Sequence, residues 1–315
     1  MYGNNMIKKT LYFGNPAYLS LKNGQMVIKL PEVIANDTVP ESFKTKNEVT
    51  KPVEDIGVVV IDNKQVTITS GLVEALLENN CALITCDSRS MPTGLMLPLN
   101  GNTTQNERFR EQIEASQPLR KQLWQQTVQQ KITNQARVLE MCTKAETRCM
   151  HVWAKDVRSG DTENMEGRAA VYYWKNLFGN IPGFTRDRNG VCPNNLLNYG
   201  YAILRAVIAR ALVASGLLPT LGIHHHNRYN AYCLADDIME PYRPYIDKVV
   251  FNIVQKYGDN VELTKEIKAQ LLSIPIIDVY IGGRQSPLMI GASQTTASLY
   301  RCFCGEVRRI AYPEL

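Results

Sequence analysis

The chain has 315 residues, of which 44% are hydrophobic, 21% charged and 8% aromatic. This composition excludes an intrinsically disordered chain and a small domain held together by disulfides. The net charge of +5 is uneven: residues 1–100 carry 9 basic and 10 acidic side chains, whereas residues 101–315 carry 26 and 20. A polyanionic partner is therefore expected to bind the second part of the chain.

No targeting or membrane segment is expected. Gly14, Asn15 and Pro16 interrupt the first apolar run, so the N-terminus lacks the core of a signal peptide. The longest apolar stretch, residues 199–218, contains Arg205 and Arg210, each of which costs about 2.5–3.5 kcal/mol at the centre of a bilayer. We expect a cytoplasmic protein without a membrane contact, whose eight scattered cysteines are reduced and buried rather than bound to zinc.

Residues 8–99 have the short, punctuated pattern of a β-rich domain. YLSL and QMVIKL flank a KNG turn and predict a β-hairpin, and GVVVID and VTIT flank a DNK turn in the same way. A short helix at residues 71–80 and a strand at CALITC complete the region.

After Gly101 the pattern becomes helical, and the PLNGN segment marks the boundary. The sequence predicts an α+β fold: a small β-rich domain at residues 1–98 and a larger, all-α-helical catalytic domain at residues 102–315. A loop is expected at residues 187–193 because of its Asn, Gly and Pro content. Helices are predicted at residues 106–116, 119–153, 162–177, 194–215, 231–239 and 249–257, with shorter ones beyond.

Histidines 224–226 and the acidic residues that follow them form the densest group of potential metal ligands. Asp237 and Glu240 are three residues apart, so they share one face of a helix. His225 lies 15 positions before Glu240, about 22 Å away on a continuous helix. The chain must therefore reverse between them if both bind one ion. Alternatively, the histidines form an exposed loop and the carboxylates pair with Arg243.

Glu166 is a second acidic candidate. Asp161, Thr162 or Asn164 can cap a helix there, which places Glu166 in its first turn, where the helix dipole favours a carboxylate. One explanation of a glutamate at this position is therefore stabilisation of a capped helix end. The other is a carboxylate that faces a cleft, because Gly167, Ala169 and Ala170 allow another helix to approach closely.

Glu166, His225 and Glu240 together form a mixed set of carboxylate and imidazole groups. Such a set suits Mg²⁺ or Mn²⁺ better than structural zinc, and phosphodiester chemistry better than acyl transfer. The sequence contains neither a GxSxG motif nor a GxxxxGK[ST] phosphate-binding loop. A metal-dependent phosphodiester reaction is the chemistry that these residue types favour.

Four motifs give the chain a recognisable likeness: NMEGRAAVYYW, PNNLLNYGYAILRA, GLLPTLGIHHHN and ADDIMEPYRPYID. In this order and spacing they closely resemble the Cas-one family of CRISPR adaptation integrases, especially the form found in type II systems. The likeness spans nearly the whole chain, with the β-domain first and the helical domain second, and is densest from residue 160 to 250.

The resemblance implies three metal ligands: Glu166 of MEGRAA, His225 of GIHH and Glu240 of DIMEP. His224 and His226, on either side of His225, leave the histidine register open.

Three further residues are interpreted from the same motifs. Asp237 is implied as a supporting residue near the metal, and Asn195, before LLNYG, as a brace for the site. The family often has a second glutamate where Pro241 stands here, and this proline predicts a bend or a restart of the helix.

The resemblance implies the integration of new spacers: a 3′-OH of a captured DNA duplex, the prespacer, attacks a repeat boundary of the CRISPR array. It also implies partners: DNA with its leader and repeat, and a heterohexamer in which two homodimers flank a dimer of the Cas-two protein. The type II likeness adds Cas-nine as a candidate partner.

The surfaces that meet these partners are less well specified. Arg186 and Arg188 are candidates for DNA contact, or belong to a solvated loop in which Asp187 offsets their charge. The β-domain, at a net charge of −1, suits dimerisation or Cas-two contact better than DNA.

Two other functions stay open: a nuclease in which water replaces the 3′-OH on branched or single-stranded DNA, and a non-catalytic DNA-binding subunit. The sequence also leaves the start at Met1 or Met6 open; a start at Met6 looks more like the family.

Overall fold

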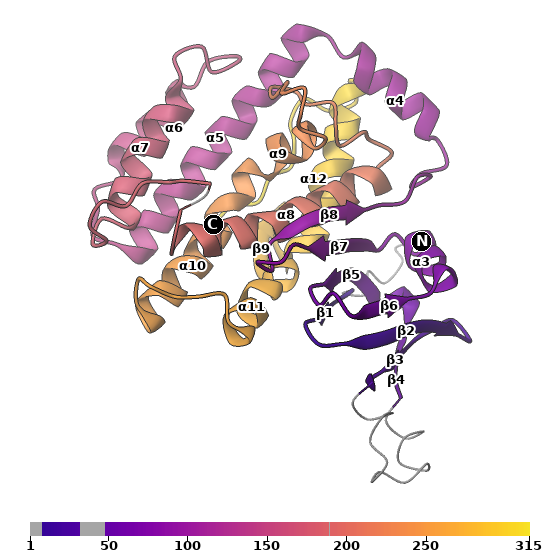
Figure 1. Ribbon diagram of the computed structural model, residues 1–315. Coiled ribbons are helices and arrows are strands. Elements are labelled where there is room, and N and C mark those ends of the chain that lie inside the picture. Colours follow the sequence, from indigo (N-terminus) through magenta and orange to yellow (C-terminus); the bar gives the residue numbers. More distant parts are fainter. Residues whose placement is uncertain (1–7, 32–47, 189) are drawn as a thin grey trace. The chain divides into compact units, whose positions relative to one another are not determined.

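The computed structural model describes residues 8–31, 48–188 and 190–315 (Figure 1). The chain divides into two compact units, Met1–Gly101 and Asn102–Leu315. The choice between Met1 and Met6 as the start falls outside the described residues.

The first unit contains two four-stranded sheets. In one sheet the neighbouring strands β1, β5 and β7 are parallel and β8 is antiparallel to β7. The central strand β5 is buried on both faces, which explains its continuous apolar run IGVVVI. The strands span Lys9–Phe13 (β1), Ile56–Ile61 (β5), Ala82–Cys86 (β7) and Pro92–Met96 (β8).

The second sheet has the order β4-β3-β2-β6 and contains the predicted hairpin. Its strands span Val49–Pro52 (β4), Gln25–Lys29 (β3), Ala17–Lys22 (β2) and Val66–Ile68 (β6). Asn23 and Gly24 both have positive φ, 51° and 71°, as a tight two-residue hairpin turn requires. The expected pairing across the DNK turn is wrong, since β5 and β6 belong to different sheets.

The core of the first unit gathers side chains from both sheets and from the helix α3, Ser70–Glu78. Leu72 and Leu76 of α3 pack with Leu19 and Met26 of the second sheet and with Val59 of the first. The side chain of Thr69 caps α3 by accepting the amide N–H of Leu72.

The second unit is mainly helical, which agrees with the predicted fold class. The predicted helix at residues 119–153 is in fact two helices, because Thr143 has an extended backbone and ends the first one. The helices span Gln105–Glu114 (α4), Gln117–Cys142 (α5), Arg148–Asp156 (α6), Met165–Leu177 (α7), Asn194–Ala214 (α8), Cys233–Met239 (α9), Arg243–Tyr257 (α10), Lys265–Leu272 (α11) and Leu288–Phe303 (α12).

The second unit also contains one β-hairpin, so the expectation of an all-helical domain is wrong in this detail. It joins β9, Asp278–Ile281, to β10, Arg284–Pro287. Gly282 and Gly283 both have positive φ at its turn, which glycine adopts without strain.

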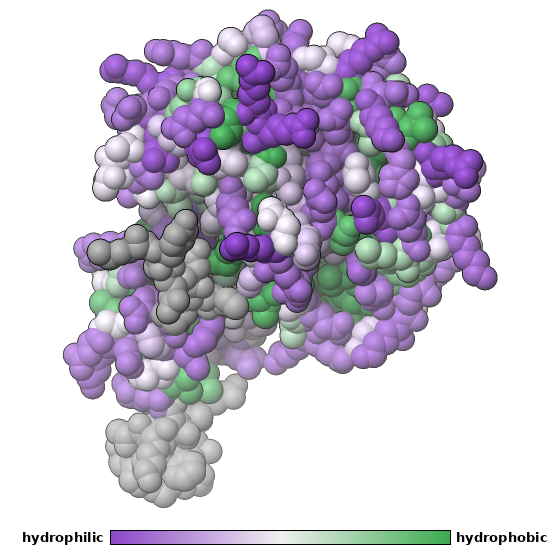
Figure 2. All heavy atoms as spheres, turned by 180° about the vertical axis from the view of Figure 1, so that it is seen from behind, coloured by the Kyte–Doolittle hydropathy of each residue, from purple (hydrophilic) through white to green (hydrophobic). Residues whose placement is uncertain are grey.

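Helix α8 is the centre of the helical unit and packs against α9, α10, α11 and α12. Within the described residues it is the one helix long and apolar enough to cross a membrane, but 78% of its apolar window is buried inside the protein. Arg205 pairs with Asp236 of α9. On the face drawn in Figure 2, hydrophilic side chains cover most of the helical unit. These features identify α8 as a core helix. All eight cysteines are free, as predicted, but the expectation that they are buried holds only for Cys81, Cys192, Cys233 and Cys302.

Candidate active site

Glu166 lies in the first turn of α7, but it does not cap the helix. Asn164 is the N-cap and accepts the N–H of Gly167, while Asp161 accepts the N–H groups of Met165 and Glu166. A Cβ at Gly167 would meet the side chain of Asn164, so this glycine makes room for the cap. Because other residues satisfy the helix end, the carboxylate of Glu166 is available for other contacts.

Lys131 of α5 joins Glu166 to Glu240. Its Nζ lies 2.6 Å from Oε1 of Glu166 and 2.5 Å from Oε2 of Glu240. Burial opposes the charge of Lys131, but the two carboxylates outweigh it and raise the pKa of the amino group. Helix α5 packs against both α7 and the turn that carries Glu240, so one ammonium group reaches two acidic residues from different elements.

Glu240 lies where α9 ends and α10 begins. Pro241 follows it in the short 3₁₀ turn Glu240–Tyr242, and α10 starts at Arg243, as the proline predicts. Glu240 is 5% exposed, and its Oε1 lies 3.0 Å from Nε of Arg243. Burial opposes its charge, but Arg243 and Lys131 outweigh burial and lower the pKa of Glu240. We conclude that this buried carboxylate is ionised.

Asp237, one turn before Glu240, organises the histidine loop. Its carboxylate accepts the backbone N–H groups of Ile223, His224 and His225. Its Oδ1 also lies 2.5 Å from Nδ1 of His225. A Cβ at Gly222 would lie 2.4 Å from the carbonyl oxygen of His225 and 2.8 Å from Oδ2 of Asp237. Glycine at this position therefore lets the loop close over Asp237.

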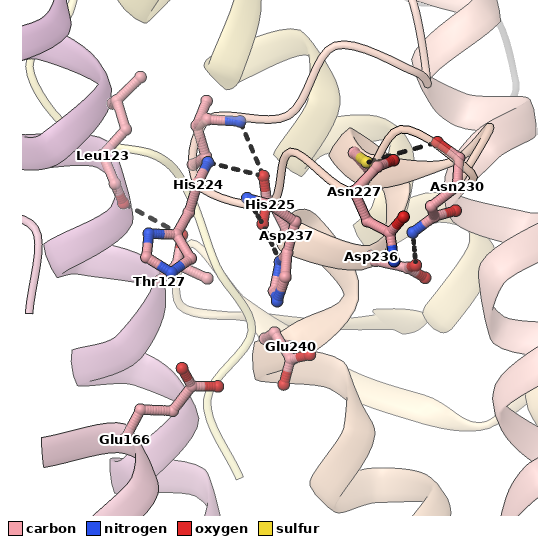
Figure 3. A network of polar contacts seen from close by, with 12 residues as sticks. Leu123, Thr127, Glu166, His224, His225, Asn227, Asn230, Asp236, Asp237 and Glu240 are labelled. Atoms are coloured by element: carbon pink, nitrogen blue, oxygen red, sulfur yellow. Dashed lines mark hydrogen bonds and ion pairs between the residues drawn. The ribbon is translucent and has the colours of Figure 1, made fainter. Parts of the chain in front are cut away.

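The three histidines have different environments. His224 stacks on the buried Trp124 of α5, with ring centroids 4.1 Å apart. His225 is 44% exposed, and its ring points from Asp237 toward the region of Glu166 and Glu240 (Figure 3). Its bond to Asp237 raises the pKa of His225, whereas burial lowers that of His224. His226 is exposed. The geometry thus distinguishes His225 from its neighbours.

Asn195 and the two loop arginines lie in other contacts. The amide of Asn195 donates to the carbonyl of Val261, and within the described ranges no hydrogen bond joins it to Glu166, His225 or Glu240. Arg186 donates to Asn194 and Asn198 of α8, so its guanidinium holds the loop to a helix. Arg188 is exposed. The brace role of Asn195 and the DNA contacts of both arginines stay predictions.

Two side chains at the site were absent from the sequence analysis, Lys131 and Trp124. Both lie on the inward stripe of α5, which continues through Val128 and Gln135 at helical spacing. A lone cation on such a stripe requires a buried anion. That signal was present in the sequence, although it did not say which acidic residue is the partner.

The donor set fits a hard divalent ion. Oε2 of Glu240 is buried and has no hydrogen bond to any described residue, and the Lys131 ion pair already brings a cation to it. Asp237 holds Nδ1 of His225, which leaves Nε2 for a ligand. Within residues 8–31, 48–188 and 190–315, no three acidic, His or Cys side chains converge tightly enough to form a finished metal cage. In this structure the two carboxylates instead share Lys131.

Comparison with known proteins identifies the family. The family described as CRISPR associated protein Cas1 matches residues 11–267. The chain belongs to the Cas1 family. The CRISPR-associated endonuclease Cas1 of Neisseria meningitidis serogroup C is 38% identical over 268 residues, which are 85% of this chain and 83% of that protein. The resemblance to the Cas-one family, inferred from four motifs, is confirmed.

Solved structures confirm the fold class. A casposase bound to an integration product has a TM-score of 0.76 at 19% identity, over 97% of this chain and 92% of that one. A Cas1 protein from Thermotoga maritima has a TM-score of 0.72 at 16% identity, over 94% and 97%. The Cas1 fold, with a strand-rich region before a mostly helical domain, therefore describes nearly the whole chain.

Proposed function

We propose that this Cas1-family protein is a CRISPR spacer-acquisition integrase. It joins prespacer 3′-OH ends to the repeat boundaries of a CRISPR array by metal-dependent transesterification. The observation that carries the proposal is the approach of Glu166 and Glu240 to one cation, with the imidazole of His225 turned toward them. The fold shared with a casposase bound to an integration product supports DNA joining as the reaction.

Glu166, Glu240 and Nε2 of His225 are the ligands we assign to Mg²⁺ or Mn²⁺, because carboxylate oxygen with one imidazole suits these ions. When bound, the ion polarises the scissile phosphate and neutralises the charge that develops on it. Asp237 fixes the orientation and tautomer of His225. Arg243 holds the other oxygen of Glu240 and keeps this carboxylate ionised.

The reaction needs no nucleotide hydrolysis, since one phosphodiester bond forms as another breaks. The 3′-OH oxygen of the prespacer attacks the phosphorus at the repeat boundary, and the 3′ oxygen of the adjoining nucleotide leaves. Two such attacks, one at each end of the repeat, require two active sites. A homodimer that assembles with Cas2 supplies more than one copy of the site.

The proposed partners are DNA, Cas2 and a second copy of the chain, in the heterohexamer that the family resemblance implies. Similar folds occur in a Cas6-RT-Cas1–Cas2 complex and in a Cas1–DNA complex. The basic excess of residues 101–315 suits phosphate contacts. We assign dimerisation and Cas2 contact to the β-rich domain, and include Cas-nine as a further candidate partner.

A metal-dependent endonuclease is the second candidate function. The Neisseria meningitidis relative is named an endonuclease, and water in place of the 3′-OH would turn the same site to hydrolysis. The two reactions require the same ligands, so the product distinguishes them.

A joining assay tests the proposal. The full chain is incubated with its Cas2 partner, a supercoiled plasmid carrying a leader and repeat, and a labelled duplex with free 3′-OH ends, with Mg²⁺, Mn²⁺ or EDTA. We expect metal-dependent covalent label at the repeat ends, lowered about 10³-fold or more by Glu166→Ala, because the ion supplies several kcal/mol. Glu163→Ala, in the exposed loop before α7, is the matched control.

Two results would contradict the proposal. Nicking of the plasmid without joining would favour the endonuclease, and full joining by the Glu166→Ala variant would favour a non-catalytic DNA-binding role.

A further inference from the structure

Lys131 is unusual among the cations of the helical unit because it lies between two acidic side chains that the proposed function assigns to a metal. Its side chain is 12% exposed, and it projects from the middle of α5 rather than from a helix end. A lysine buried to this degree retains its charge because anions compensate it. Here the compensation comes from Glu166 and Glu240 together.

The two contacts of Lys131 have an electrostatic consequence. Without a cation between them, Glu166 and the buried Glu240 would repel each other. The ammonium group therefore stabilises the arrangement of the site. The same oxygens, Oε1 of Glu166 and Oε2 of Glu240, face Nζ of Lys131 at 2.6 and 2.5 Å. A divalent ion bound by these oxygens would have to lie where the ammonium group now lies.

We infer that Lys131 is a built-in counter-ion that competes with the divalent metal and leaves the carboxylates when the metal binds. The inference rests on the proposed function, since it takes Glu166 and Glu240 as ligands. The lysine side chain carries its charge at the end of a flexible four-carbon stem. The ammonium group can therefore move away without unfolding α5. Its departure also removes the repulsion between the ammonium group and the incoming ion.

The alternative is a fixed structural ion pair in which Lys131 holds the two glutamates in place for the metal. The two roles predict opposite signs. If Lys131 competes, its removal tightens metal binding, whereas if it positions the ligands, its removal loosens the site and weakens metal binding. The affinity for metal thus separates the two roles without reference to catalysis.

The test is titration calorimetry of Mn²⁺ into the full-length protein. We expect Lys131→Met and Lys131→Gln to bind Mn²⁺ at least about tenfold more tightly than the wild type, because one positive charge beside the ion is removed. Lys131→Arg, which keeps the charge, should not gain affinity. Arg137→Met removes a charge from the exposed face of the same helix and should leave the affinity unchanged.

A thermal readout accompanies the titration. In EDTA, Lys131→Met leaves the two carboxylates without a bridging cation, so its melting temperature should fall below that of the wild type. Mn²⁺ should then raise the melting temperature of the variant by more than that of the wild type. Lys131→Gln, which can still hydrogen-bond a carboxylate, serves if the Met variant does not fold.

Unchanged or weaker Mn²⁺ binding in both neutral variants would overturn the inference. Glu166→Gln separates this failure from that of the proposed function. If Glu166→Gln weakens Mn²⁺ binding but the neutral Lys131 variants do not tighten it, the competition is wrong and the ligand set stands. If Glu166→Gln binds as tightly as the wild type, the ligand set itself is wrong.

Discussion

Two acidic clusters in the helical unit lie close in sequence but differ in how their charge is compensated. In the first, the Lys131 cluster, Lys131 and Arg243 surround Glu166 and Glu240. In the second, the Asp247 cluster, the hydroxyl groups of Tyr173 and Tyr201 donate to Asp247, and the bond from Tyr173 is 2.9 Å long. Cations contact the carboxylates of the first cluster directly, whereas neutral hydroxyl groups donate the hydrogen bonds to Asp247, on which Arg186 and Arg243 act through their charge.

This difference sets the protonation of the two clusters. Lys131 and Arg243 lower the pKa of Glu240 despite its burial. At Asp247, burial outweighs the two hydroxyl groups and the charges of Arg186 and Arg243, and raises the pKa of that carboxyl to about 7. Glu166 is 24% exposed, whereas Asp247 is sealed inside the protein. An ionised, partly open cluster can exchange cations, but a sealed cluster that is close to neutral serves packing. We therefore expect changes in the first to affect chemistry and changes in the second to affect stability.

After that of Glu166→Ala, the largest effect that would sharpen this comparison is expected at His225. His225→Ala removes the imidazole that faces Glu166 and Glu240, so joining should fall by about 10²-fold or more while the melting temperature changes little. His226→Ala, one residue on and exposed, is the matched control and should join as well as the wild type. Equal losses in the two variants would contradict the assignment of His225, rather than a neighbouring histidine, as the metal ligand.

A smaller loss is expected at Asp237, which acts on the first cluster through His225. Asp237→Asn places an amide N–H₂ group against the loop amides and His225, so joining should fall by about 10- to 100-fold. The neighbouring variant Asp236→Asn is the control, because Asp236 pairs with Arg205 instead. Comparison of joining rates at saturating and at limiting Mn²⁺ checks the mechanism. A loss that excess Mn²⁺ does not reduce would argue against an effect on metal binding.

The smallest effect on joining is expected at the second cluster. Because the pKa of Asp247 rises from 3.8 to about 7 on folding, its stabilising contribution is complete below about pH 4 and is lost as the pH rises through 7. The wild type should lose a few kcal/mol of unfolding free energy between pH 4 and pH 8, whereas Asp247→Asn, which has no carboxyl to titrate, should not. The stability of the variant relative to the wild type should therefore rise by that amount over this pH range. Denaturant titrations at several pH values measure this difference. If the difference in unfolding free energy between the variant and the wild type does not change with pH, the contrast drawn between the two clusters is wrong.

The sequence predicted those features that depend on local pattern. Backbone preferences of single residues explain the hairpin turn at Asn23 and Gly24 and the start of a new helix after Pro241. The residues alone therefore indicated both features. The helix break near Thr143 was missed because the apolar spacing continues across it. The β9–β10 hairpin was missed because its strands are too short to show an alternating apolar pattern.

Site geometry was less accessible from the sequence. The four motifs identified Glu166, His225 and Glu240 as candidates, but the pairing of the two glutamates through Lys131 depends on how α5 packs against α7 and the turn after α9. Likewise, the sequence offered Asp161, Thr162 and Asn164 as possible caps of α7, and only the folded loop shows that Asn164 is the N-cap and that Asp161 accepts two further N–H groups. Contacts between elements distant in the chain decide both points.

Anomalous diffraction from crystals grown with Mn²⁺ tests the central claim most directly. We predict a manganese peak within about 2.0–2.4 Å of a carboxylate oxygen of Glu166, a carboxylate oxygen of Glu240 and Nε2 of His225, with Nζ of Lys131 withdrawn from both glutamates. A manganese peak at other residues, with Lys131 still bridging Glu166 and Glu240, would contradict it.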